Sequence, residues 1–252
     1  MPRVFSVNFF AAEWWTAEKT AGAFAVACLV IAILLLGKPA FSNASLPVGG
    51  ITDPVIAIQA AHSTKDVDYV LGQAPSQDRE VMRVKEHIGF ASLVAYAALF
   101  LALSVLLLRS GAVGRIIAPA AMVLAVAAAG FGAAGNLAVV RLLDVNLFDT
   151  TGKMINAIRS AAFVYWTLDS AVRLLLSIYF FRTPKLLWRL TGVLFAITAL
   201  MQLYGLRDGQ FLVVASIPSG LALLLIAVMM LFPRRLMRRK SAGGISGAPP
   251  TS

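Results

Sequence analysis

Six long apolar segments constrain the fold of this chain more than any other feature of its sequence. They lie at residues 21–37, 88–108, 116–140, 157–181, 186–206 and 211–232. A helix needs about 20 predominantly apolar residues to cross the hydrocarbon core of a bilayer. Such a segment must be helical in lipid, because no water is present there to bond its backbone groups. The segments therefore predict an all-α fold, a six-helix transmembrane bundle.

The composition supports a membrane protein and excludes several classes of soluble enzyme. The chain is 59% hydrophobic and only 13% charged, whereas a soluble domain is about 45–50% apolar and about 25% charged. The single cysteine, Cys28, cannot form an internal disulfide or a cysteine-rich metal site. We find no phosphate-binding loop, no serine-hydrolase elbow and no dinucleotide-binding glycine pattern. No catalytic residue and no cofactor is therefore expected.

The basic residues are distributed unequally about the six segments, and this distribution predicts the orientation. With six crossings, the N-terminus, the second and fourth connections and the C-terminal tail lie on one side. That side has 12 basic and 2 acidic residues, which accounts for the whole formal net charge of +10. Short cytoplasmic loops are enriched in Lys and Arg, so we expect both termini to be cytoplasmic. The basic composition then indicates topology, and a nucleic-acid partner is not expected.

The connection 38–87 is the one long loop, and the orientation places it outside the cytoplasm. It contains three signals for the start of a helix. Asp53 is an N-cap residue followed by a proline at the first helical position. Ser63 and Asp66 resemble a capping box, and Ser76 precedes a charged helix that continues into the second crossing. The loop therefore predicts a small extracytoplasmic helical cap on the bundle.

Residues 21–240, with this cap, are expected to form one transmembrane unit. Residues 1–20 combine Phe and Trp with charged residues, which predicts an amphipathic segment in the membrane interface. A plain aromatic belt before the first crossing and a helix that docks a partner are the alternatives. Residues 241–252 are small and polar and contain Pro, which predicts a disordered tail.

Asp169 and Arg173 are opposite charges inside the fourth apolar segment. Their spacing places both on one helix face, with Tyr165 one turn earlier. A charge near the bilayer centre costs about 2.5–3.5 kcal/mol, so the pair should face the bundle interior. One interpretation is a functional site in which Arg173 binds an anion and Asp169 holds or relays a proton. The other is an ion pair that only sets the register of the bundle.

The third apolar segment contains a run of small residues that includes Gly130, Gly132 and Gly135. Such a surface lets a neighbouring helix approach closely, and helix packing is the interpretation that we favour. The alternative is a groove lined by backbone, in which Asn136 is the polar contact. Gln202 on the fifth segment is a candidate polar neighbour, so both residues join the candidate intramembrane polar site.

Four residues near the cap could in principle ligate a metal: His62, Asp66, Glu86 and His87. Their spacing matches no ligand motif such as H-E-x-x-H. A helix start at Ser63 would also separate His62 from the helix that carries Asp66. We therefore predict no metal site and interpret these residues as interfacial polar groups of the cap.

Three runs of the sequence resemble a broad group of uncharacterised bacterial multi-pass membrane proteins with an extracytoplasmic helical cap. The runs are ITDPVIAIQAAHSTKDVDYVLGQ (51–73), HIGFASLVAYAALFLAL (87–103) and GNLAVVRLLD (135–144). The group often has an Asp where the spanning helix follows the cap, and Ile88-Gly89 stand there in this chain. The resemblance covers about residues 50–180 and implies a topology, since the group carries no assigned activity.

These observations leave three functions open for an integral protein of the bacterial plasma (inner) membrane. The first is a non-catalytic accessory, sensor or scaffold protein, which the shortage of titratable residues and the cap favour. The second is a small-solute or proton-coupled transporter that uses Asp169 and Arg173. The third is a membrane enzyme that acts on a lipid or quinone. The expected partners are the lipid bilayer and either another protein or a second copy of the chain.

Overall fold

The computed structural model describes residues 6–37, 40–42, 48 and 50–232. Six helical segments in this part are long and apolar enough to cross a membrane. They are α1 (Ser6–Leu36), α4 (Gln77–Leu108), α5 (Ala112–Leu143), α6 (Gly152–Arg182), α7 (Leu186–Gly205) and the pair α8 (Gln210–Val214) and α9 (Ser216–Leu231). The predicted all-α fold with six spanning helices is confirmed, and the chain is a multi-pass integral membrane protein.

The helices extend beyond the predicted apolar segments, because a helix continues outside the hydrocarbon wherever its caps allow. The chain is helical from Ser6 to Leu36 without a break, so the predicted interfacial segment is continuous with the first crossing. Whether it lies in the membrane interface stays a prediction. The sixth crossing is interrupted between α8 and α9, one turn before Pro218. A proline lacks the N–H that would continue the helical bonds at this point. The predicted tail, 241–252, lies outside the described residues.

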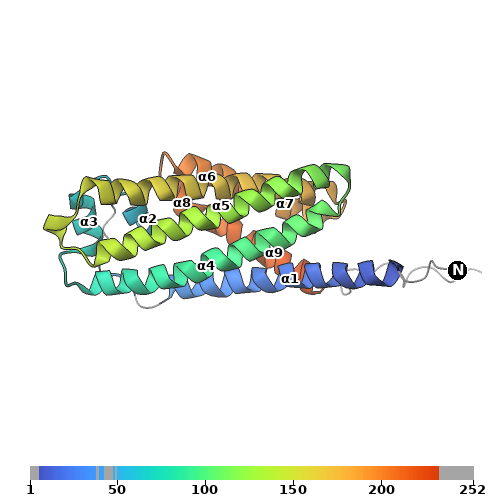
Figure 1. Ribbon diagram of the computed structural model, residues 1–252, viewed down its shortest axis with the longest axis horizontal. Helices are drawn as coiled ribbons and strands as arrows, with labels where there is room; N and C mark the ends of the chain where they lie inside the picture. The colour runs from blue at the N-terminus through green and yellow to red at the C-terminus, as the bar shows by residue number, and fades with distance from the viewer. Residues whose placement is uncertain (1–5, 38–39, 43–47, 49, 233–252) are drawn as a thin grey trace, which may run out of the picture.

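The six crossings form a closed ring. Helix α1 packs against α4, and contacts then follow in order from α4 to α5, α6, α7 and α9, which returns to α1. The ring interior is filled by apolar side chains such as Leu99, Leu103, Leu176 and Phe195. Figure 1 shows the elongated bundle, with α2 and α3 together at one end and the N-terminal end of α1 at the other.

The cap contains two short helices, α2 (Pro54–Gln59) and α3 (Thr64–Leu71), and both begin where the sequence predicts. Asp53 accepts hydrogen bonds from the backbone N–H groups of residues 55 and 56. Ser63 and Asp66 form the predicted capping box. Partial burial would raise the pKa of Asp66, but hydrogen bonds from His62 and Ser63 outweigh it and lower that pKa. These caps and the helical form of the loop are confirmed, whereas its extracytoplasmic side stays a prediction.

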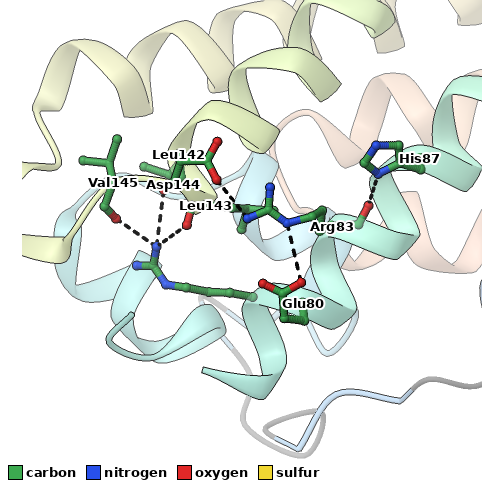
Figure 2. A network of polar contacts seen from close by, with 8 residues as sticks. Glu80, Arg83, His87, Leu142, Leu143, Asp144 and Val145 are labelled. Atoms are coloured by element: carbon green, nitrogen blue, oxygen red, sulfur yellow. Dashed lines mark hydrogen bonds and ion pairs between the residues drawn. The ribbon is translucent and has the colours of Figure 1, made fainter. Parts of the chain in front are cut away.

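The first turns of α4 join the cap to the bundle. The Asp78 carboxylate accepts hydrogen bonds from the backbone and hydroxyl of Ser42. The buried guanidinium of Arg79 donates to the carbonyl oxygens of Leu142, Leu143 and Val145 at the end of α5. Figure 2 shows these three carbonyl groups converging at the end of α5. Buried charges at the start of α4 thus bind the segment around Ser42 and the end of α5.

Candidate functional site

The Asp169–Arg173 pair lies inside the ring, as its apolar context requires. Asp169 is 2% exposed and Arg173 is 3% exposed. Arg173 Nε donates to Asp169 Oδ2 at 2.6 Å, and Gln202 Nε2 of α7 donates to the same oxygen at 2.9 Å. Arg173 Nη1 donates to Ser219 Oγ of α9 at 3.1 Å. The pair therefore connects three helices of the ring, α6, α7 and α9.

Aromatic rings surround the guanidinium of Arg173. Its Cζ lies 5.4 Å from the ring centre of Tyr96, 5.3 Å from that of Phe100 and 5.7 Å from that of Phe195. A guanidinium within about 6 Å of a ring centre gains cation–π attraction, which is largest where water is excluded. The charge of Arg173 is thus compensated by Asp169 and by aromatic faces from α4 and α7. This arrangement suits an ion pair that holds helices together.

A second polar region lies between the cap and the ring, in a partly open cavity of about 240 Å³. Helices α4, α5 and α6 form its walls, and the end of α1 and the start of α2 border it. Its lining residues are Leu35, Leu36, Asp53, Val55, Ile56, Gln59, Lys85, Glu86, Gly89, Ser92, Leu93, Phe131, Gly132, Gly135, Asn136, Ala162, Tyr165 and Trp166. A small concave space with few polar groups and many apolar ones has the character of a ligand pocket.

Glu86 is the most unusual residue of this cavity. It is 2% exposed, and its Oε1 has no hydrogen-bond partner. Its Oε2 accepts a hydrogen bond from the Asn136 amide at 3.2 Å, in the amide orientation that also bonds the Gly132 carbonyl. Within the described part of the chain, no cation forms an ion pair with Glu86. Burying a carboxylate without an ionic partner costs free energy, and a proton, a hydrogen-bond donor or a cation would lower that cost.

Two glycines make room for this arrangement. A Cβ at Gly89 would lie 2.8 Å from the Asn136 amide, so a larger residue there would displace it. A Cβ at Gly132 would lie 2.6 Å from Leu93 and 3.1 Å from the Tyr165 ring. The close approach of α4 and α6 to α5 therefore depends on bare backbone at these positions.

Lys85 is adjacent to Glu86, but its ammonium group binds the end of α1. Its Nζ donates to the carbonyl oxygens of Leu35 and Gly37 at 2.5 and 2.7 Å. These carbonyls are at the end of α1, where the helix dipole favours a positive charge. Lys85 thus caps α1 and borders the cavity, while the Glu86 carboxyl has only an amide beside it.

The structure divides the predicted polar site into two groups. Gln202 lies with Asp169 and Arg173 inside the ring, whereas Asn136 and Tyr165 line the cavity.

The three glycines of α5 also differ in their surroundings. Gly132 and Gly135 line the cavity and also meet neighbouring helices. A Cβ at Gly130 would have no described atom within 4 Å. The groove interpretation of this glycine run therefore has geometric support at two of its three positions.

Glu86 is predicted from the sequence only as an interfacial polar residue of the cap, whereas the structure places it in the wall of the cavity. The available signal was its position, since Glu86 lies two residues before the apolar segment 88–108 and one turn before Gly89 and Phe90. In the described residues, no three His, Cys, Asp or Glu side chains come together in a way that could hold a metal ion. His62 instead contacts Arg159 through its Nδ1 in a wide groove of about 1110 Å³ beside the cap.

Comparisons with protein-family models, with curated proteins and with solved structures give no match for this chain. The resemblance to uncharacterised bacterial membrane proteins therefore stays a prediction. The functional argument depends on the residues of the site alone.

Proposed function

We propose that this protein is a non-catalytic membrane protein that binds a small molecule in the cavity beside Glu86, and that it acts as a sensor or accessory subunit. The observation that carries the proposal is the buried Glu86 carboxyl, with one oxygen unpartnered, in the wall of a partly open cavity. Ionisable residues buried within membrane helices are functional by default, because their burial is costly. The cap is placed to respond to an occupant, since Asp53 and helix α2 border the same space.

The polar groups of the cavity favour binding over catalysis. Nucleophilic catalysis needs a nucleophile within hydrogen-bond distance of a base. The residues that line the cavity include no histidine and no cysteine. Ser92 and Tyr165 line it, but neither has a hydrogen bond to Glu86 among the bonds of the described residues. An enzyme that acts on a lipid or quinone is therefore the least supported of the three functions.

The transporter is the second candidate, and it would use Asp169 and Arg173. Its support is the default functional meaning of charges inside a membrane. Against it stands the bonding of the pair, because Arg173 and Gln202 both donate to the Asp169 carboxylate. Neither Asp169 nor Arg173 lines the Glu86 cavity. For the orientation, we propose cytoplasmic termini and an extracytoplasmic cap in a bacterial plasma membrane, as the distribution of basic residues supports.

Diisopropylcarbodiimide, a small apolar reagent for protonated carboxyls, tests the proposed site without knowledge of the ligand. We expect it to label Glu86 in the full chain in lipid nanodiscs and to leave Asp169 unlabelled, as peptide mass spectrometry would measure. Gly135→Leu adds a side chain to the cavity wall and should reduce the labelling. Gly130→Leu is the matched control, since a Cβ there would meet no described atom.

Native mass spectrometry of the same samples tests the function. A small molecule retained by the wild type and by Gly130→Leu, but lost from Gly135→Leu, would support binding in the cavity. Chemical conversion of that molecule by the protein would support an enzyme instead. Absence of labelling at Glu86, or labelling that Gly135→Leu does not change, would contradict the proposal.

A further inference from the structure

The charge of the cavity indicates what kind of ligand it accepts. Its lining contains two carboxyl groups, those of Asp53 and Glu86, and one ammonium group, that of Lys85. Asp53 is satisfied by the N–H groups at the start of α2. Lys85 is satisfied by the carbonyl oxygens at the end of α1. Of these three groups, only the Glu86 carboxyl has an oxygen without a partner. When ionised, it would place a negative charge in the cavity wall without a counter-ion.

Glu86 lines the cavity, and one of its two oxygens is left to accept a hydrogen bond from a ligand. Oε2 is engaged by the Asn136 amide, whereas Oε1 is buried and has no partner. A charge-assisted hydrogen bond from an N–H group to a carboxylate is about twice as strong as a neutral one. An occupant with a positively charged donor would therefore satisfy both the oxygen and its charge. An anionic occupant would add a second uncompensated charge beside the carboxyl.

The remaining walls suit an apolar or aromatic body. Phe131, Tyr165 and Trp166 line the cavity from α5 and α6, and Leu93 lines it from α4. Aromatic faces attract ammonium groups and also pack well against hydrocarbon. The volume of about 240 Å³ is below the range of about 300–1,000 Å³ that is typical of pockets for drug-sized ligands. The occupant is therefore small, of the size of one ring or a short aliphatic chain.

We propose that the ligand of this cavity is a small organic ammonium, a primary or secondary amine with an apolar or aromatic body, whose N–H binds Glu86 Oε1. This inference rests on the proposed function, because it names the chemical class of the molecule that the cavity binds. The ammonium donates to Glu86, and the apolar part lies among the aromatic side chains of α5 and α6.

Benzylamine and its neutral isostere benzyl alcohol are the probes. Binding to the full chain in phosphatidylcholine nanodiscs is measured by isothermal titration calorimetry. We expect benzylamine to bind at least about tenfold more tightly than benzyl alcohol, because only the amine brings a charge to Glu86. Glu86→Gln should weaken benzylamine binding by about 30-fold or more, since it removes one member of a buried charged pair.

Glu80→Gln is the matched control, because Glu80 is on the same helix and its side chain is 72% exposed. It should leave benzylamine binding unchanged. If Glu86→Gln fails to fold, Glu86→Asp keeps the carboxylate and should keep the preference for the amine. Gly135→Leu should weaken both probes, because it narrows the space that they share.

The outcomes separate this inference from the proposed function. Equal binding of the amine and the alcohol, or unchanged benzylamine binding in Glu86→Gln, would overturn the ammonium class. The ammonium class also fails if neither probe binds while carbodiimide still labels Glu86, and the proposed function then stands. If neither probe binds and Glu86 is not labelled, both proposals fail.

Discussion

Asp169 and Glu86 are both buried carboxyls on membrane-spanning helices, yet their surroundings differ in kind. Asp169 has a cation and an amide donating to one of its oxygens. Glu86 has an amide on one oxygen and nothing on the other. A buried charge is stable when it is paired and hydrogen-bonded, and costly when it is not. At the scale of single residues, this difference supports the proposal that Asp169 stabilises the bundle and that Glu86 binds a ligand.

The first prediction concerns the buried pair. Arg173→Met would leave the Asp169 carboxylate without its cation, so we expect the free energy of unfolding to fall by about 3–5 kcal/mol. The double variant Asp169→Leu/Arg173→Met should recover part of this loss, because no unpaired charge is left. Thermal or denaturant unfolding in one detergent would measure both. Arg189→Met, at an exposed position, is the control.

The same residues distinguish the transporter from the binding protein. In a transporter that uses the pair, Asp169→Asn would abolish transport into proteoliposomes while the protein still expressed and folded. If Asp169→Asn lowers only stability, the pair is structural. Normal stability of Arg173→Met would contradict a structural role for the pair.

At the scale of elements, the start of α4 forms long-range polar contacts with the end of α1, with Ser42 and with the end of α5. Its first turns present Asp78, Arg79, Arg83 and Lys85 to different parts of the chain. Arg79 and Lys85 each reach the C-terminal carbonyl groups of another helix, α5 and α1 respectively. A helix leaves its last four carbonyl groups without partners inside the helix, and cations are favourable there. The start of α4 thus provides hydrogen-bond donors for the C-terminal carbonyl groups of α5 and α1.

The second prediction compares two arginines one turn apart on α4. Arg79 is buried and bonds three carbonyl oxygens at the end of α5, whereas Arg83 forms exposed ion pairs with Glu80 and Asp144 (Figure 2). Arg79→Met should lower the free energy of unfolding by at least about 2 kcal/mol, because it leaves the carbonyl groups of Leu143 and Val145 without their donor.

Arg83→Met should change the same quantity by less than about 1 kcal/mol, as is usual for exposed ion pairs. Unfolding of both variants in one detergent gives the comparison. Equal losses would show that Arg79 contributes no more than a surface charge and would contradict its role at the end of α5.

At the scale of the whole molecule, the ring of helices places all connections at two ends. The cap and the connections that follow α5 and α7 lie at one end, while those that follow α4 and α6 lie at the other. This alternation is what an even number of antiparallel crossings requires. The described basic residues Arg109, Arg115, Arg182, Lys185 and Arg189 lie at or beside the connections opposite the cap, which supports the proposed orientation.

The third prediction tests that orientation. In a Cys28→Ala background, Lys65→Cys places a thiol on α3 of the cap, and Lys185→Cys places one between α6 and α7. A membrane-impermeant maleimide should label Lys65→Cys on intact cells and Lys185→Cys only after lysis. The reverse pattern would contradict the orientation, and labelling of both from outside would contradict the alternation of crossings.

The six crossings and the starts of α2, α3 and α4 could be predicted from the sequence alone. Hydropathy over about 20 residues decides whether a segment crosses a membrane, and a capping residue such as Asp53 or Ser63 acts on amide groups only two or three positions away. These signals are local, so they can be read without knowledge of the fold. The spacing of Asp169 and Arg173 likewise determined that they pair.

Which residues become long-range neighbours depends on how the helices pack in three dimensions. Glu86, Asn136 and Tyr165 come from three helices, and they share a cavity only because each helix has a particular rotation about its axis. That rotation follows from the packing of side chains far apart in sequence, among them Leu93 and Tyr165 against Gly132. No local pattern carries this information. The position of Glu86 in the cavity, on which the proposed function depends, therefore could not be predicted from the sequence.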